Sequence, residues 1–484
     1  MSHRIVLAVA VLCLFVTGPA RATWPDVGLV ILPESTDEIE SVRTLPDGTG
    51  GLFVVWGENG PGITLGTQRL KAQRIDADGN LLWGPSGVLI KVPAEELVFV
   101  ADLAADGAGG FLVAWTEGVP FSNTDPLAYV QRVSGNGELL WLASGVRPQA
   151  GTADQLDVVV TSDGAQGAIV GWMDLRSGAR QPYANRISPA GSPLWSITGR
   201  RVADTGGTDL QVLPDVGGGA SFYWKTTTQL QWQRVEANGG PGFLAPINLV
   251  VATRDLLVDP KVVATPTARV VVYQDESFSS SNLLRAAAFG TLGQPLWNRT
   301  VDVDSAPTAT FLRAAVAVDP VTADVVVAWR TDEDDLPRLQ RLTDDGTPRY
   351  GAAGLVLGDA PGFGLGVALD PSGDAVVAWN GADPTVFPEN RVLAQRVGLD
   401  GRARWDVGGR EVGTAIGERG LRTLVPDPVG GAYVAMEEND NRLVIQRVEP
   451  EHGFWGRPAP SIAATGDVPG DQGGAIEVAW DASP

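Results

Sequence analysis

The chain has 484 residues, of which 44% are hydrophobic and 19% are charged, and its formal net charge is −21. This hydrophobic content is too high for a disordered chain, and the length suffices for several domains or one large repeat array. The acidity excludes a basic surface for nucleic acid or for an anionic membrane, so we expect neither partner.

Residues 1–22 are predicted to be a secretory signal peptide. Arg4 precedes an apolar stretch that runs from Ile5 to Val16, and residues 20–22 form a small-x-small cleavage motif. The stretch is shorter than the roughly 20 residues that a spanning helix needs, and no later segment is long and apolar enough. We therefore expect a protein without a membrane span that is secreted, periplasmic or held at the cell surface.

Cysteine and histidine are nearly absent beyond this segment. Cys13 lies inside the predicted signal peptide, and His452 is the only histidine after it. Disulfides, thiol catalysis, Cys–zinc sites and multi-histidine metal sites are therefore excluded. We expect His452 to be a solvated turn residue. No cofactor and no metal site are predicted, with Ca²⁺ bound by acidic loops as the alternative.

An internal repeat is the dominant feature of the sequence. Its first element is a Gly-led apolar run that ends in a large residue, as in residues 50–56 and 109–115. These runs end at Trp56, Trp115, Trp172, Trp224, Tyr273, Trp329, Trp379 and Met436. The second element is Gln-Arg, an aliphatic residue, a polar turn and an aromatic, as in residues 73–83. Its aromatics are Trp83, Trp141, Trp195, Phe243, Trp297, Tyr350, Trp405 and Trp455.

Each unit is predicted to form four short strands. These are an aliphatic alternating segment, the Gly-led run, the Gln-Arg strand, and a fourth strand that starts at the second aromatic. No segment keeps a helical period. The repeat predicts an all-β fold, a β-propeller of about eight four-stranded blades over residues 23–460, with seven blades as the alternative. Residues 24–30 match the start of a fourth strand, so we expect them to pair with the last blade and close the ring.

The Trp-bearing turns resemble the tryptophan-docking repeats of eight-bladed quinoprotein dehydrogenases. Asp76, Gly79 and Trp83 match that pattern with one residue fewer. The resemblance implies that the aromatic packs between neighbouring blades. It gives a structural docking role to Trp83, Trp141, Trp195, Trp297 and Trp405. We expect no quinone, because those enzymes commonly carry a Cys-Cys pair that is missing here.

The whole unit is similar to a secreted bacterial propeller repeat that often precedes fibronectin-III-like and sorting domains. Residues 461–484 break the repeat. The segment from Ala475 to Trp480 resembles the first strand of a fibronectin-III-like domain that is cut off at once. A ninth Gly-led strand is the alternative.

Function is expected on the loops between the second and third strands, because their lengths vary while the turn before the second aromatic hardly does. These loops and those linking blades should gather at one face around the central channel. The candidate ligand-binding residues there are Glu58, Glu117, Phe121, Asp174, Arg176, Tyr183, Asp275, Asp332, Asp335 and Phe387. The recurring Gln-Arg pairs are interpreted as structural, with each arginine capping its own blade or pairing with a neighbouring carboxylate.

We expect a monomeric, non-catalytic module for binding or surface display, with a glycan or an extracellular protein as its ligand. The alternative is an extracellular glycan-active enzyme of hydrolase or lyase type. Such an enzyme would use two carboxylates about 5–10 Å apart as acid and base, with aromatics around them. No catalytic residue stands out in the sequence, because many acids qualify equally.

Overall fold

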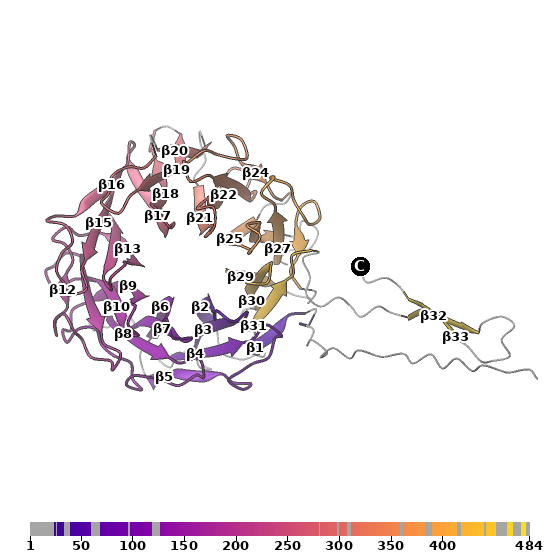
Figure 1. Ribbon diagram of the computed structural model, residues 1–484, viewed down its shortest axis with the longest axis horizontal. Helices are drawn as coiled ribbons and strands as arrows, with labels where there is room; N and C mark the ends of the chain where they lie inside the picture. The colour runs from indigo at the N-terminus through magenta and orange to yellow at the C-terminus, as the bar shows by residue number, and fades with distance from the viewer. Residues whose placement is uncertain are drawn as a thin grey trace, which may run out of the picture.

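The computed structural model describes residues 24–25, 27–32, 39–59, 68–94, 97–118, 126–279, 281–297, 300–306, 311–358, 362–382, 390–413, 418–439, 442–451, 462–467 and 476–480. These residues form strands and turns arranged as a ring of blades, shown in Figure 1. The predicted signal peptide, His452 and Trp455 lie outside the described residues.

The first four blades follow one another along the chain, each an antiparallel sheet whose strands pair in sequence order. Blade 1 contains β2 (Ile39–Pro46), β3 (Leu52–Asn59), β4 (Gln68–Ile75) and β5 (Val88–Ala94). Blade 2 contains β6 (Leu97–Ala105), β7 (Phe111–Gly118) and β8 (Leu127–Val133). Blade 3 contains β9 (Gln155–Ser162), β10 (Ala168–Asp174), β11 (Gln181–Ile187) and β12 (Arg200–Arg201). Blade 4 contains β13 (Thr208–Pro214), β14 (Ala220–Lys225), β15 (Gln229–Val235) and β16 (Ile247–Val251).

The remaining four blades complete the ring. Blade 5 contains β17 (Leu256–Ala264), β18 (Arg269–Glu276), β19 (Asn282–Phe289) and β20 (Val301–Ala306). Blade 6 contains β21 (Phe311–Val318), β22 (Val325–Thr331), β23 (Arg338–Leu342) and β24 (Leu355–Val356). Blade 7 contains β25 (Gly362–Leu369), β26 (Ala375–Ala382), β27 (Asn390–Val397) and β28 (Arg410–Glu411). Blade 8 contains β29 (Arg419–Pro426), β30 (Ala432–Glu438), β31 (Arg442–Val448) and, from the N-terminus, β1 (Leu29–Leu32).

The ring closes as the sequence predicts. β1 pairs antiparallel with β31, with Leu29 opposite Ile445, and so supplies the outermost strand of blade 8. The first strands of the blades contact one another in order, and β29 contacts β2. The count of eight blades is therefore confirmed over the alternative of seven. In blade 2 the fourth position is held by a single bridge between Val130 and Val146.

The prediction that the fourth strand starts at the second aromatic is wrong. Trp83 lies in the turn before β5, which begins at Val88. A short bridge between Ile75 and Leu81 closes this turn first. The chain then needs a second turn at Gly87, whose φ is +64°, before it can pair with the third strand.

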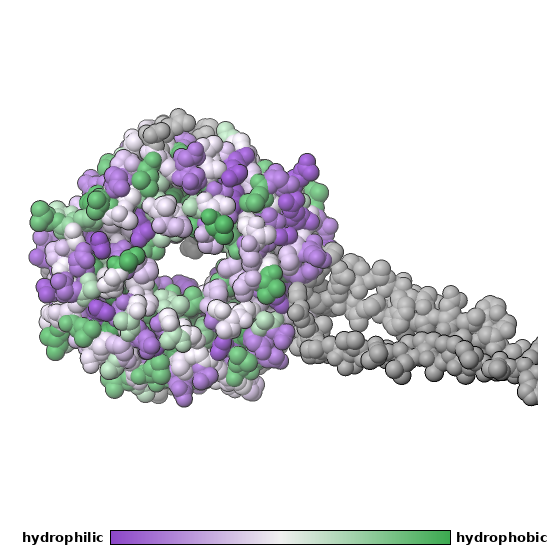
Figure 2. Space-filling view, viewed as in Figure 1, coloured by the Kyte–Doolittle hydropathy of each residue, from purple (hydrophilic) through white to green (hydrophobic). Residues whose placement is uncertain are grey.

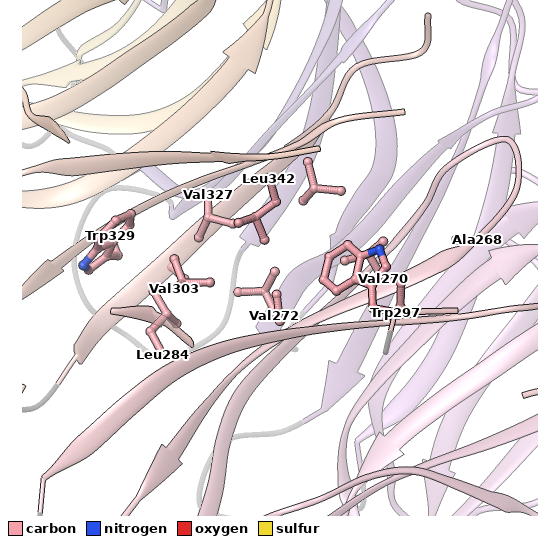
Figure 3. Packing of buried hydrophobic residues seen from close by; sticks show 13 residues of the cluster. Ala268, Val270, Val272, Leu284, Trp297, Val303, Val327, Trp329 and Leu342 are labelled. Carbon is pink, nitrogen blue, oxygen red and sulfur yellow. The ribbon is translucent and has the colours of Figure 1, made fainter. Parts of the chain in front are cut away.

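The hydrophobic core is divided among the gaps between adjacent blades. Figure 3 shows the gap between blades 5 and 6, where Val272 and Leu284 face Val327 and Trp329. The second strand of each blade packs against neighbours on both sides, so β10 is buried along its whole length. This double burial explains why the Gly-led runs are continuously apolar.

Each first strand carries a bulge where it passes the central channel. The bulged residue has a positive φ in five blades, at Ser41, Asp157, Asp209, Asp259 and Gly364. A bulge twists the strand and re-aims the extra side chain. Figure 2 shows the ring open at its centre.

A separate two-stranded sheet, β32 (Ile462–Asp467) paired with β33 (Ile476–Trp480), follows the eight blades. Its strands fall within the segment that the sequence assigns to a truncated fibronectin-III-like domain. That assignment stays a prediction.

Candidate functional site

The loops between second and third strands lie with the linkers between blades at one face, called here the loop face. Leu175 donates its amide to the carbonyl of Asp154 in the linker before blade 3. Gly207, in the linker after blade 3, donates its amide to the carbonyl of Arg180. The turns that join first to second and third to fourth strands lie at the opposite face, because successive antiparallel strands reverse direction.

Two of the predicted ligand-binding carboxylates on the loop face are buried and bound by the blades themselves. Glu58 Oε1 accepts the indole N–H of Trp56 at 2.8 Å, and Lys71 Nζ lies 3.1 Å from Glu58 Oε2. Glu117 accepts the indole N–H of Trp115 at 2.7 Å and pairs with a lysine of blade 1. Both side chains therefore complete the packing of their blades.

Asp174, Arg176 and Tyr183 form one cluster at the end of blade 3 that faces the loop face. Asp174 accepts the indole N–H of Trp172 at 2.8 Å and pairs with Arg176 at 2.6 Å. Burial alone would raise the pKa of Asp174, but hydrogen bonds from Arg176 and Trp172 outweigh it and lower that pKa. The Arg176 guanidinium lies 4.2 Å from the centre of the Tyr183 ring, which stacks on Trp172. The cluster is internally neutralised.

The three other predicted acids that the structure describes lie in blades 5 and 6. Asp275 is fully buried, and Arg285 Nη1 lies 2.7 Å from its carboxylate. Asp332 is exposed in the turn after β22. Asp335 pairs with Arg330 at 2.7 Å.

Phe121 and Phe387 lie outside the described residues. The other eight predicted ligand-binding residues are spread over blades 1, 2, 3, 5 and 6. Of these, the structure brings together Asp174, Arg176 and Tyr183. Ligand binding by these residues stays a prediction.

The five tryptophans with a predicted docking role each reach the next blade. Their indole nitrogens donate to backbone carbonyls in the turn that follows the third strand of that blade. The pairs are Trp83 with Gly135 at 3.3 Å, Trp141 with Pro189 at 2.9 Å, Trp195 with Ala237 at 2.9 Å, Trp297 with Asp344 at 2.7 Å and Trp405 with Pro450 at 3.2 Å. Trp24 makes the same contact with Ala77 across the closure of the ring.

The Gln-Arg pairs hold turns at the opposite face. Gln73 Oε1 accepts the amides of Arg74 and Trp83, which fixes the turn before the fourth strand. Arg74 donates from Nε to Asp47 at 2.9 Å and from Nη1 to the carbonyl of Gly135 in the next blade at 3.0 Å. One arginine thus joins a turn of its own blade to a turn of the following blade.

The wall of the central channel contains acids that our sequence analysis did not select. The first strands of blades 2 to 5 line a cavity of about 520 Å³, called here the channel-wall cavity. Asp102, Asp157 and Asp209 border it, and the Asp209 amide donates to Asp157 Oδ2 at 3.1 Å. In the sequence, the signal for these channel-wall acids is an aspartate at one equivalent position of the aliphatic first strand in units 3, 4 and 5. The bulges that turn these residues toward the channel have no sequence signature.

Burial changes the proton affinity of two of these acids. Burial raises the pKa of Asp102 to about 6, although amides of Val160 and Leu103 and the charge of Arg43 act in the opposite direction. Burial also raises the pKa of Asp157. Asp102 links blade 2 to blade 3, because its Oδ2 accepts a hydrogen bond from the amide of Val160 at 2.9 Å.

A second cavity opens on the loop face at blade 4. Residues 206–208, 225–227 and 256–258 line a volume of about 440 Å³, called here the blade-4 hollow. Blade 4 has a short loop, residues 226–228, between its second and third strands, and in this turn the Thr226 amide donates to the carbonyl of Gln229.

Among the described residues, no group of three or more His, Cys, Asp or Glu side chains is arranged to hold a metal ion. The idea of Ca²⁺ bound by acidic loops stays a prediction. No helix within the described ranges is long and apolar enough to cross a membrane.

Comparison with known proteins shows no matching family model and no matching curated protein. Solved structures with a similar arrangement include a protein from Lactobacillus plantarum, 13% identical, with a TM-score of 0.45 over 78% of this chain and 97% of the other. Puromycin hydrolase is 14% identical, with a TM-score of 0.44 over 79% of this chain and 58% of the other. An exo-β-1,3-galactanase from Clostridium thermocellum is 12% identical, with a TM-score of 0.33 over 82% and 95%. The named activities belong to those proteins.

Proposed function

We propose that this chain is an exported, non-catalytic binding or surface-display propeller that recognises a glycan or an extracellular protein through its loop face. One observation carries the proposal. The predicted acids Glu58, Glu117, Asp174 and Asp275 are held by indole, lysine or arginine groups of the blades, and the loop face also carries the blade-4 hollow, which has both polar and apolar lining residues.

This arrangement favours binding over general acid–base catalysis on the loop face. A catalytic acid or base must be free to exchange a proton with a substrate. Asp174 instead has a lowered pKa and two partners, which suits a permanent anion in a structural role. Export is inferred from the predicted signal peptide, and we propose that the mature chain acts as a monomer without a cofactor.

A glycan-active enzyme is the second candidate, and the channel-wall cavity favours it. Asp157 and Asp209 adjoin there, and the raised pKa of Asp157 would suit a proton donor. Against this candidate, none of the described residues that line the cavity is an aromatic that could stack on a sugar ring.

The test is a thermal-shift screen of the chain from residue 23 against neutral oligosaccharides, acidic oligosaccharides and peptides, combined with assays for released reducing ends. A ligand at 100 times its dissociation constant should add about 2.7 kcal/mol to stability. A shift without product supports a binding module. Product that disappears in an Asp157→Asn, Asp209→Asn double variant supports the enzyme. No shift with any ligand would contradict glycan or peptide binding.

A further inference from the structure

Side chains along the channel wall join the first strands of neighbouring blades by binding a backbone amide of the next blade. Asp102 of β6 is one of them, because its Oδ2 accepts the amide of Val160 in β9 at 2.9 Å. β6 and β9 contact each other at the channel, as Figure 1 shows. β9 is the innermost strand of blade 3 and pairs with β10 alone, so this bond gives the Val160 amide a partner on the open edge of its sheet.

Gln211 makes the same kind of link between blades 4 and 5. Its Oε1 accepts the amide of Val262 at 2.9 Å, and its Nε2 donates to the carbonyl of Pro260 at 2.8 Å. Asp102 and Gln211 occupy equivalent places, since each follows the bulge of its first strand and lies opposite the residue that precedes the tryptophan of the second strand. One position of the repeat therefore holds a titratable group in blade 2 and a neutral amide in blade 4.

The surroundings of Asp102 favour its neutral form. Its side chain is partly exposed in the channel-wall cavity, so protons can reach it. Burial raises the pKa of Asp102 from 3.8 to about 6. The amides of Val160 and Leu103 and the charge of Arg43 on β2 act in the opposite direction, but they do not outweigh the loss of hydration.

Other charged groups face the same part of the channel wall. Asp157 of β9 and Asp209 of β13 border the cavity beside Asp102, and their negative charge also disfavours a second ionised carboxylate. Arg180 and Lys225 offset part of that charge. Strands β3, β4 and β7 also contact β6, and they carry the ion pairs Glu58 with Lys71, Arg74 with Asp47, and Glu117 with Lys91.

Opening of the junction between β6 and β9 would release the carboxylate of Asp102 into water, where its pKa returns to 3.8. A group whose pKa is raised in the closed form holds its proton more tightly there than in the open form. Loss of the proton as the pH rises from about 4 to about 6 therefore favours opening. The difference between the two pKa values corresponds to a roughly 100-fold rise in the opening constant.

We propose that the junction of β6 and β9 at the channel wall is a pH-sensitive switch, which is closed when Asp102 is protonated and opens more readily when Asp102 is ionised. The junction of β13 and β17, held by the neutral Gln211, does not respond to pH. Because residues 157–159 of β9 line the cavity beside Asp102, opening changes the shape of the channel-wall cavity. The switch goes beyond ligand recognition by the loop face and does not depend on it.

The experiment measures hydrogen exchange of the Val160 and Val262 amides in the chain from residue 23, with the intrinsic exchange rate at each pH divided out. From about pH 4 to about pH 7, we expect the opening constant of Val160 to rise about 100-fold and that of Val262 to stay unchanged. Asp102→Asn and Asp102→Gln replace the carboxylate by a neutral amide and should make Val160 as insensitive to pH as Val262. Gln211→Glu makes the reverse exchange and should give the Val262 amide a pH dependence of its own.

The two amides in the unaltered chain decide the matter first. An equal response at Val160 and Val262, or no response at Val160, would overturn the switch, because the first is global loosening and the second leaves the junction closed. A rise at Val160 that survives in both Asp102→Asn and Asp102→Gln would also overturn it, as would a Val262 amide that stays unresponsive in Gln211→Glu. The comparison of the two amides needs no substitution, so it remains decisive if a variant fails to fold.

Discussion

The pairing of indole N–H groups with carboxylates predicts unequal costs for one substitution made in two blades. Trp115 and Trp224 occupy equivalent places in β7 and β14, and both are fully buried. The Trp115 indole N–H donates to Glu117 at 2.7 Å, whereas the Trp224 indole N–H has no hydrogen-bond partner among the described residues. Replacement by Phe removes a similar ring volume at each position, so the loss of packing is common to both variants.

The difference between the variants comes from the hydrogen bond. A bond to a charged group contributes about 1.5–3 kcal/mol, and its loss leaves a buried acceptor short of a partner. Removal of an unpartnered N–H carries no such cost. We expect Trp115→Phe to lower the free energy of unfolding by at least about 1.5 kcal/mol more than Trp224→Phe does.

Urea denaturation followed by circular dichroism measures this difference, provided that the slopes of the two variants agree. The remaining partner of Glu117 in the variant is Lys91, 2.8 Å away, so the carboxylate is not left without a counter-charge. Equal losses, within about 0.5 kcal/mol, would refute the assignment of Trp224 as an unpartnered donor.

Three further predictions concern the channel, the arginines and the glycines. Burial raises the pKa of Asp102 from 3.8 to about 6, so the folded state holds its proton more tightly than the unfolded chain does. Wild-type stability should therefore fall relative to Asp102→Asn as the pH rises from about 4 to about 6, and a difference in unfolding free energy that stays constant with pH would contradict this. Arg341→Ala should cost about 3–5 kcal/mol in urea denaturation, because the fully buried arginine lies between two buried aspartates, whereas Arg402→Ala, with a side chain 83% exposed, should cost less than about 0.5 kcal/mol. Gly145→Ala and Gly48→Ala share a positive φ, of 79° and 77°, but only the Cβ at Gly145 would meet an indole, at 2.5 Å. Gly145→Ala should therefore melt at the lower temperature, and equal melting would count against the steric argument.

The fold could be predicted because every unit of the repeat has the same pattern of strand and turn residues. The Gly-led run is apolar throughout since its strand is buried on both sides, and the Asp-Gly and Gly-Gly turns determine where each strand reverses. The match of residues 24–30 to a fourth strand predicted the closure, and β1 pairs with β31 accordingly. The start of the fourth strand was misplaced because Trp83 lies in a turn whose second half depends on Gly87.

The candidate site could be predicted from the sequence less well than the fold. The acids in the variable loops drew attention by their number, yet Glu58 and Glu117 accept hydrogen bonds from the indoles of Trp56 and Trp115 on their own strands. Each glutamate lies two positions after its tryptophan on the same strand, and therefore on the same face, so strand alternation could have indicated this pairing. The burial of each pair is decided by the packing of the blades.

The sequence by itself determined the all-β propeller architecture and indicated the closure, because strand period, turn residues and repeat length are local properties, while the structure decided for eight blades over seven. Only the tertiary structure decided which polar groups remain available to bind a ligand. The bulges at Asp157 and Asp209, and the burial of the Trp224 indole N–H without a hydrogen-bond partner among the described residues, come from the fold. Whether a polar group can bind a ligand depends on its neighbours in space, and in this ring those neighbours come from residues about fifty positions apart in the chain.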